Sequence, residues 1–444
     1  MTAESPASSA LAEFGNVGRL RELLQPLRSS PSAYHARHLG GLVDVAAADA
    51  VGRLAEIWTS VPPTTKAELL DDQAAAPPYG TRLLVPRSRL HLVVESSGST
   101  SGVREVHALT AADEQRVLQM MSECFREVGL VDDDCVAITL PIGTAGGGAK
   151  VYHTVRAIGA LALRLGALST EEKAAAICSF RPTVIVATPH YLDRLALSIR
   201  SQGHDPAGLG VRTVLIATQS VSVEWVRRVR RTWNASVHEW YGNASGFFAM
   251  TCRHGVADDD DRWGTLHWDP DFQLLEMVDD GRLAGDGEYG ELLGTHLANA
   301  TSPLLRYRLG DEAQFVPAGT CACGSSRPGL RAGTIRRADG MVKFRAVSLW
   351  PSAVDRVLAG VAGIDSSWVV LRTDDRAAEI AECYVRPATG RDFDYEAVAA
   401  RVREATGVRF AVIPWENDEA PEPCRVVRAN GKSPRWVDLR QTTS

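Results

Sequence analysis

Residues 90–104 read Leu90-His-Leu-Val-Val-Glu95-Ser-Ser-Gly-Ser-Thr-Ser-Gly-Val-Arg104, an apolar strand that runs into a loop of glycines and hydroxyl residues. Glycine lets backbone N–H groups turn toward an anion, and serine and threonine hydroxyls add further donors. No Gly-Lys-Ser/Thr follows, so this is not a Walker loop, and a flexible linker is the alternative interpretation. Because an apolar strand leads directly into the loop, we favour a polyphosphate-binding site.

The chain on either side of this loop alternates between strand-like and helix-like segments. Further strand-like runs are Cys135–Leu140, Thr183–Ala187 and Thr213–Ala217. The helix-like segments are Val17–Leu27, Val51–Ser60, Ala111–Val128, Thr170–Cys178 and Val223–Trp233. Short buried strands that alternate with helices predict a largely parallel α/β sheet, with Leu90–Glu95 as one of its strands.

After Tyr241 the sequence contains more strand-like runs, among them Leu274–Val278 and Glu291–His296. A last compact unit begins near residue 340 and mixes two helices with three strands. Its predicted elements are Pro351–Leu358, Trp368–Leu371, Ala381–Val385, Tyr395–Thr406 and Phe410–Pro414, before an extended tail over Pro421–Ser444. We therefore expect a large N-terminal α/β domain with a β-rich subdomain over residues 1–336 and a small α+β domain over residues 337–444.

The bulk composition excludes several classes of function. A formal net charge of -6 over 444 residues provides no basic excess for nucleic acid. No apolar run approaches the roughly 18 residues of a membrane span, and no signal peptide is evident, so we expect a cytoplasmic protein with no membrane partner. Eight cysteines in a chain of this length do not form a disulfide framework.

Four further segments carry residue types suited to a nucleotide and an acid. An aromatic followed by glycine, Tyr241-Gly242, can stack on a base; a tyrosine at a core turn is the alternative. The segment Tyr307-Arg-Leu-Gly-Asp311 ends in a carboxylate that can hold ribose hydroxyls; a surface ion pair is the alternative. The last two segments are residues 336–345 and Asn430-Gly-Lys432-Ser-Pro-Arg435. Lysine is rare in this chain, so Lys432 in a polar loop is a candidate partner for a phosphate or carboxylate.

In this order, the five segments resemble the adenylate-forming superfamily, and within it the phenylacetate–CoA ligase branch, from about residue 90 to residue 440. The resemblance implies an acyl-adenylate made from ATP, Mg²⁺ and a carboxylic acid, with CoA as the default acceptor and a homodimer as a candidate assembly. It implies that the small domain is mobile and rotates about Asp339. It assigns catalytic roles to Lys432 and Arg104.

The resemblance also assigns binding roles. The implied nucleotide-binding residues are Ser97, Gly98, Ser99, Thr100, Ser101, Gly102, Tyr241, Gly242, Asn243, Ser245, Asp311 and Arg337. The residues implied for the acid pocket, by position in the sequence only, are Gly147, Tyr152, His190, Tyr191 and Thr218. The substrate class that the resemblance implies for this pocket is a small, aromatic or otherwise apolar acid.

A candidate metal site comes from two separated segments. Cys321-Ala-Cys323 lies downstream of Cys252, His254 and His267, and such cysteine and histidine ligands can build a tetrahedral zinc site. Unrelated thiols and imidazoles are the alternative. Branch members resemble this pattern, and their histidine lies in a Gly-Leu-His sequence that Gly264-Thr-Leu-His267 matches. We therefore predict a structural zinc on Cys252, His267, Cys321 and Cys323.

Three departures from the family bear on function. Ser245 stands where a magnesium-holding glutamate is usual, Val103 stands where proline is common, and Ala346 stands where the CoA arm usually passes a glycine. A methyl group at position 346 narrows such a passage. An amine, a carrier thiol or an inorganic nucleophile such as nitrite is thus an alternative acceptor. A non-catalytic nucleotide-binding homologue is an alternative of another class. A zinc-stabilised interaction module would leave the nucleotide motifs unexplained.

Overall fold

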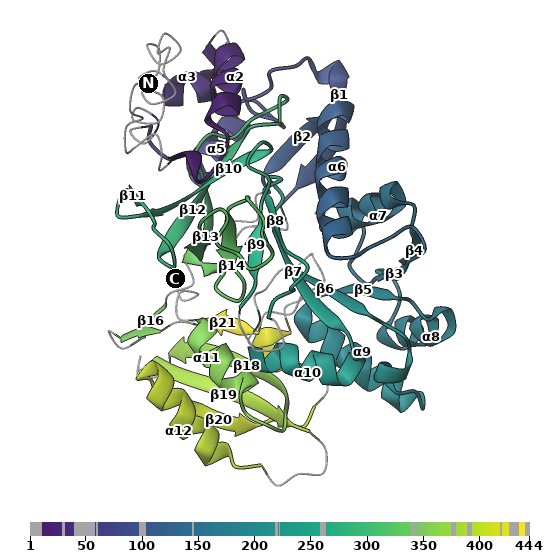
Figure 1. Ribbon diagram of the computed structural model, residues 1–444. Helices are drawn as coiled ribbons and strands as arrows, with labels where there is room; N and C mark the ends of the chain where they lie inside the picture. The colour runs from purple at the N-terminus through teal and green to yellow at the C-terminus, as the bar shows by residue number, and fades with distance from the viewer. Residues whose placement is uncertain are drawn as a thin grey trace. The chain divides into compact units, whose positions relative to one another are not determined.

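The structure is a computed structural model (Figure 1) that describes residues 11–28, 32–39, 58, 61–96, 104–143, 146–217, 221, 223–257, 263–338, 342–344, 347–349, 351–373, 379–388, 393–417, 420–425 and 435–439. The chain divides into two compact units, Met1–Ile335 and Arg336–Ser444. This division lies next to the predicted domain boundary after residue 336.

The first unit combines helices with one long mixed sheet. Its helices are α2 (Val17–Arg28), α3 (Ala33–Leu39), α5 (Lys66–Ala75), α6 (Ala111–Glu127), α7 (Gly147–Ile158), α8 (Thr170–Phe180), α9 (Pro189–Ser201) and α10 (Val223–Trp233), with short turns η2 (Arg87–Arg89) and η3 (Pro206–Gly208). Its strands are β1 (Leu90–Glu95), β2 (Val106–Thr110), β3 (Cys135–Ile138), β4 (Leu161–Arg164), β5 (Val184–Ala187), β6 (Thr213–Ala217), β7 (Ser236–Gly242), β8 (Phe248–Thr251), β9 (Thr265–His267), β10 (Gln273–Asp279), β11 (Arg282–Leu283), β12 (Tyr289–His296), β13 (Tyr307–Val316) and β14 (Gly329–Arg331).

The long sheet has a parallel half and an antiparallel half. Its spatial order is β11-β10-β12-β13-β14-β9-β8-β7-β6-β5-β3-β4. Neighbours among β7, β6, β5, β3 and β4 pair in parallel, and the strands from β8 onward pair antiparallel. The predicted α/β class with a β-rich subdomain is confirmed.

Helices cover both faces of the parallel strands, because successive side chains of each strand point to opposite faces. Val136, Val184 and Leu215 lie in one apolar cluster with residues of α6 and α7. Their sequence neighbours Ala137 and Ile185 lie in the other cluster, with residues of α8, α9 and α10. Figure 1 shows these two sets of helices on opposite sides of β3, β5 and β6. All five of these strand residues are fully buried.

The strand before the glycine-serine loop is not part of this parallel sheet, which corrects the prediction. β1 pairs antiparallel with β2 in a separate two-stranded ribbon, with Glu95 opposite Val106. The backbone N–H of Ser96 donates to the carbonyl of Glu105 at 3.0 Å, and the N–H of Glu105 donates to Ser96 Oγ at 3.0 Å. The loop is therefore a hairpin loop, and the strand that follows it was missed because its five residues merge into the next helix.

The starts of three helices follow from local sequence. α5, α6 and α8 each begin with a capping box, in which Thr65, Thr110 or Ser169 bonds with an acidic residue three positions later. Helix α7 begins differently, after Gly146 and without a side-chain cap. A Cβ atom on Gly148 would collide with the backbone carbonyl of Pro141, so glycine allows α7 to approach the end of β3 closely.

The second unit is a small α+β fold. Its elements are β15 (Arg336–Arg337), β16 (Val342–Phe344), β17 (Val347–Leu349), α11 (Pro351–Ala359), β18 (Ile364–Thr373), β19 (Glu379–Pro387), α12 (Tyr395–Thr406), β20 (Ala411–Pro414), η5 (Glu422–Cys424) and β21 (Trp436–Asp438). Its main sheet has the order β20-β19-β18-β21. Val354 of α11 and Val402 of α12 pack with Val369 of β18 in a core of its own.

The predicted extended tail is wrong within the residues that the structure describes. β21 pairs in parallel with β18, with Val437 opposite Val370. Cys424 is fully buried against Trp368 and Val370. The tail was read as extended because its prolines and polar residues conceal the short apolar strand Trp436–Asp438. It covers the second face of the small sheet.

Within the described parts of both units, we find no helix with the length and apolar character needed to cross a membrane.

Candidate functional site

A direct hydrogen bond joins two of the motifs identified in the sequence. Tyr241 lies at the end of β7, and its hydroxyl donates to Asp311 Oδ2 of β13 at 2.9 Å. Tyr241 is buried. Gly310, just before Asp311, has φ +72, a conformation that favours glycine at this position of the motif. Seventy residues apart in sequence, the aromatic and the carboxylate thus belong to one site.

Asn243 shapes the turn after Tyr241. Its Oδ1 accepts from Ser245 Oγ at 2.9 Å and from the N–H groups of Gly246 at 3.1 Å and Phe247 at 3.2 Å. Such bonds from an asparagine side chain to the following backbone stabilise tight turns. Ser245, in the place of the family's glutamate, is buried and uses its hydroxyl hydrogen within the turn.

Arg104 lies at the far side of the glycine-serine loop and pairs with the residue at its near side. Its guanidinium donates to Glu95 Oε2 at 3.1 Å, and both side chains are about a third exposed. Gln73 of α5 donates to the Arg104 carbonyl at 2.9 Å and accepts from the N–H of Val106 at 2.9 Å. The base of the loop is therefore held by one ion pair and by helix α5.

Glu105 is a buried carboxylate that the sequence reasoning missed. It accepts from Lys66 Nζ at 2.6 Å, from Tyr307 Oη at 3.1 Å and from His107 Nε2 at 3.3 Å. Burial alone would raise its pKa, but the bonds from His107 and Lys66 outweigh burial and hold the pKa at about 2. Through Tyr307, Glu105 connects the base of the loop to the Tyr307–Asp311 motif. Its only signal in the sequence is its position next to Arg104.

Several predicted site residues lie outside the described residues. These are Ser97, Gly98, Ser99, Thr100, Ser101, Gly102, Thr218, Asp339 and Lys432. The side chains of His190 and Arg337 are likewise outside the description. Their roles stay predictions.

The predicted acid-pocket residues that are described do not meet in one cavity. Tyr152 of α7 packs against the cluster that includes α6, with the Arg164 guanidinium 5.3 Å from its ring centre. Tyr191 of α9 packs against the cluster on the other face of the sheet, and donates to Thr170 Oγ1 at 3.3 Å. Gly147 is exposed at the start of α7. The roles of these residues in an acid pocket stay predictions.

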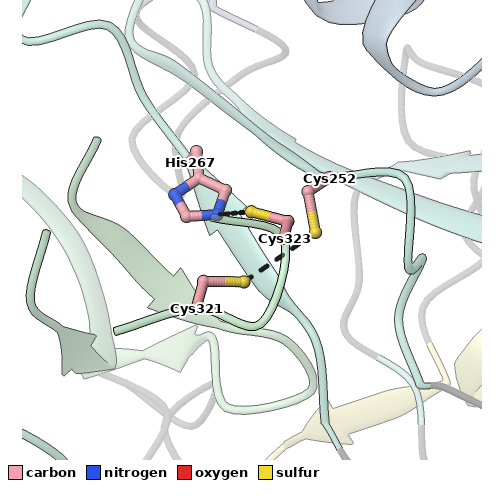
Figure 2. A group of neighbouring side chains, drawn as sticks. All are labelled: Cys252, His267, Cys321 and Cys323. Carbon is pink, nitrogen blue, oxygen red and sulfur yellow. Dashed lines mark hydrogen bonds between the residues drawn. The ribbon is translucent and has the colours of Figure 1, made fainter. Parts of the chain in front are cut away.

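The four predicted metal ligands come together (Figure 2). The ligand atoms of Cys252, His267, Cys321 and Cys323 all lie within 4.8 Å of one another, and Figure 2 shows their side chains pointing toward a common centre. Cys252 Sγ lies 3.9 Å from Cys321 Sγ, and Cys323 Sγ lies 3.4 Å from His267 Nε2. His254 does not belong to this group. The site thus brings Cys252, just after β8, and His267 of β9 together with the loop that carries Cys321 and Cys323.

This donor set fits tetrahedral zinc. A zinc ion with Zn–S bonds of about 2.3 Å separates neighbouring sulfurs by about 3.8 Å, close to the observed sulfur separation. The His267 Nδ1–H donates to the carbonyls of Arg327 at 3.0 Å and Pro328 at 3.2 Å, which leaves the Nε2 lone pair for a metal. With four protein ligands the site has no open position, so its role would be structural.

Part of the chain matches a known protein family. Residues 96–297 match the family described as AMP-binding enzyme. This segment contains the glycine-serine loop and the Tyr241 turn. Together with the relatives below, the match supports the resemblance of the motifs to the adenylate-forming superfamily and to its phenylacetate–CoA ligase-like branch.

The relatives are distant and differ in how much of each chain aligns. Phenylacetate–coenzyme A ligase of Pseudomonas putida is 27% identical over 297 residues, 66% of this chain but only 64% of that enzyme, slightly under two thirds of its length. The enzyme of the same name from Thermus thermophilus is 27% identical over 426 residues, 90% of this chain and 91% of that enzyme. A crystal structure of 2-hydroxyisobutyryl-CoA ligase in complex with R3-HIB-AMP superposes with a TM-score of 0.81, at 20% identity over 96% of this chain and 89% of that one. The last comparison shows the fold.

Proposed function

We propose that this protein activates a small carboxylic acid with ATP as an acyl-adenylate, releases pyrophosphate, and then transfers the acyl group to an acceptor, with CoA as the default. The observation that carries the proposal is the bond between Tyr241 and Asp311, which joins the proposed adenine-stacking and ribose-binding motifs at one point. The named activities of the relatives, both acid–CoA ligases, support the same reaction class. An aromatic acid is the first substrate class to test.

In the proposed first step, a carboxylate oxygen attacks the α-phosphorus of ATP and the bond to pyrophosphate breaks. Both reactants are anionic, so the repulsion between them has to be cancelled. The ammonium of Lys432 is assigned this role, while Arg104 and the loop hydroxyls hold the outer phosphates. Asp311, whose carboxylate is oriented by Tyr241, accepts from the ribose hydroxyls.

Magnesium, when bound with ATP, neutralises phosphate charge. The residue in the family's usual ligand position, Ser245, offers a hydroxyl that already donates to Asn243. The ion would then be held through phosphate oxygens and water, without a carboxylate from the Tyr241 turn.

In the proposed second step, the acceptor attacks the acyl carbon and AMP leaves. For CoA the nucleophile is a thiolate; Ala346, which lies outside the described residues, stands where the family resemblance implies a glycine beside the CoA arm. An amine, a carrier thiol or an inorganic nucleophile such as nitrite is the alternative acceptor. The alternative of another class, nucleotide binding without catalysis, rests on Ser245.

The test is the release of pyrophosphate and AMP from ATP with a panel of aromatic and aliphatic acids, each with and without CoA. We expect pyrophosphate from at least one acid, and a loss of about 10²–10³-fold in Lys432→Ala, the usual cost of removing one charge-stabilising group. AMP release that does not depend on CoA would keep the adenylation and replace the acceptor. No pyrophosphate from any acid would overturn the proposal in favour of the non-catalytic class.

We also propose that Cys252, His267, Cys321 and Cys323 hold a structural zinc. The separations of their ligand atoms and the donor on His267 Nδ1 support it. Metal analysis of the purified protein should find about one zinc per chain, and a protein without metal would contradict this assignment.

A further inference from the structure

A small cavity lies between strand β1 and the Tyr241 turn. Val94, the last but one residue of β1, lines it on one side, and Ser245 and Gly246 of the Tyr241 turn line it on another. The volume that it leaves open to a water-sized molecule is about 20 Å³. About 10–15 Å³ suffices for one water molecule, so the cavity accepts one small polar group.

Lys150 also lines this cavity. Lys150 projects from the first turns of α7, and no acidic side chain among the described residues forms an ion pair with it. The acid in the lining, Asp113, is already neutralised by Arg116 at 2.7 Å and accepts further bonds from Thr110 and Thr301. Lys150 is half-buried by area, and burial of its ammonium lowers its pKa to about 8.

A second donor in the lining is also unsatisfied. His296 Nδ1 accepts from the backbone N–H of Leu304 at 3.2 Å, so in the neutral ring the proton lies on Nε2. Burial and the charge of His107 lower the His296 pKa to about 3, against an opposing contribution from the Ser245 backbone, and so keep the ring neutral. Nε2 is buried and makes no well-formed hydrogen bond among the described residues, although the Ser245 backbone lies close enough to influence the ring. His296 is itself only 2% exposed.

A buried N–H without a well-formed hydrogen bond and a half-buried ammonium without a counter-ion both cost free energy, and a ligand that supplies an acceptor removes that cost. We propose that this cavity is an oxyanion subsite, in which Lys150 Nζ and His296 Nε2–H bind a carboxylate or phosphoryl oxygen of the reacting ligands. This inference rests on the proposed function, because its ligand is either a second carboxylate on the acid substrate or a phosphate of ATP. Ser245 fits the same picture, because a glutamate there would bring a competing anion to the subsite.

The closing experiment compares wild type with Lys150→Met, which keeps the length of the side chain and removes its charge. Arg200→Met, which removes one exposed charge at the end of α9, is the control. The acids are matched pairs with and without a second carboxylate, such as succinate with butyrate, and the readout is KM for the acid and for ATP. A bond to an ionic group is worth about tenfold or more in affinity.

If the ligand is a second carboxylate, Lys150→Met raises KM for the dicarboxylate about tenfold and leaves KM for ATP and the monocarboxylate unchanged. If the ligand is a phosphate, Lys150→Met raises KM for ATP with every acid. Either result supports the subsite, and unchanged KM values in an active Lys150→Met enzyme overturn it. The melting temperature of ligand-free Lys150→Met should equal or exceed that of wild type, since an uncompensated charge is removed.

A failure of the proposed function can be told apart from a failure of the subsite. If wild type makes no pyrophosphate from any acid, calorimetric titration of the full chain with pyrophosphate and with succinate tests the subsite alone. Binding to wild type that weakens at least about tenfold in Lys150→Met, but not in Arg200→Met, supports it. The absence of binding to wild type, or equal binding to both variants, would overturn the subsite. If Lys150→Met does not fold, Lys150→Gln takes its place in the experiment.

Discussion

Single hydroxyl and carboxylate groups set the geometry of the proposed nucleotide site, and Tyr241 is the clearest case. Tyr241→Phe keeps the ring for stacking but removes the bond that orients the Asp311 carboxylate. We expect KM for ATP to rise about three- to tenfold, the value of one hydrogen bond of about 1 kcal/mol, with little change in kcat. Tyr79→Phe, at a surface turn, is the control, and an unchanged KM in Tyr241→Phe would contradict the assigned role of Asp311.

Gly148 is a second residue at which a single added atom, a Cβ, is expected to change stability. A Cβ there would meet the backbone of Pro141 and Leu140, which cannot rotate away as a side chain can. Gly148→Ala should lower the free energy of unfolding by about 1–3 kcal/mol, the usual cost of overpacking. At Gly147, one position earlier, a Cβ meets nothing within 4 Å, so Gly147→Ala should be neutral or slightly stabilising. Denaturant titration measures both, and equal stabilities would contradict the close approach of α7.

Sequence reasoning at this scale found residues that belong to recurring motifs and missed residues that act through long-range contacts. Tyr241 and Asp311 were predicted from their motifs, and the structure joins them. Glu105 and Lys150 were not singled out, because their chemistry depends on partners far away in the chain or on the absence of a partner. A local sequence pattern shows neither the burial of the Glu105 carboxylate nor the missing counter-ion of Lys150 within the described residues.

Among the elements, the Glu105 carboxylate contributes to the connection of the β1–β2 ribbon to Lys66 of α5 and Tyr307 of β13. Because the pKa of Glu105 in the folded protein is about 2, below its ordinary value of 4.5, the ionised form stabilises the fold above about pH 4.5. This contribution is lost as the pH falls from 4.5 toward 2. Glu105→Gln should cost about 1–3 kcal/mol at pH 7 because Lys66 and Tyr307 lose a charged acceptor.

The measurement is the difference in unfolding free energy between wild type and Glu105→Gln from pH 7 down to pH 3. The difference should shrink as the pH falls below about 4.5. Glu123→Gln, on the exposed face of α6, is the control, with a small difference at every pH. A Glu105→Gln difference that stays constant with pH would contradict the ionised state of Glu105.

The proposed zinc centre fastens the loop that carries Cys321 and Cys323 to β8 and β9. Cys323→Ser should abolish stoichiometric zinc and lower the melting temperature by several degrees, because ligand removal leaves three donors around the ion. A strong chelator should lower the melting temperature of wild type in the same way. Cys178→Ser, at a half-buried thiol outside the cluster, should keep its zinc. Retention of zinc by Cys323→Ser would contradict the ligand assignment.

Among the predicted helices, Val51–Ser60 lies almost entirely outside the described residues, and the other periodic helices were predicted within a few residues. Val223–Trp233 and Tyr395–Thr406 match α10 and α12. Helix α7 was not predicted, since its Gly146-Gly147-Gly148 start carries no apolar pattern. β1 was wrongly assigned to the parallel sheet, and β21 was wrongly read as part of an extended tail. Both errors have one cause, because tertiary contacts and not propensity decide how short strands pair.

At the scale of the whole molecule, each unit has its own apolar core, so each can be tested for independent folding. A chain that ends at Ile335 keeps the clusters on both faces of the long sheet and all four proposed zinc ligands. We expect this shortened protein to unfold cooperatively and to bind zinc and ATP. It should show no pyrophosphate exchange, because it lacks Lys432. Exchange by the shortened protein would contradict the catalytic role of that lysine.

The unpredicted strand β21 limits how far Lys432 can travel. The carbonyl of Arg435 accepts from the Val369 N–H at 2.7 Å, so the chain is anchored to β18 only three residues after Lys432. Three residues span at most about 11 Å when fully extended. Lys432 therefore stays within this distance of Arg435, and any position farther away requires β18, and the small unit with it, to move as one body.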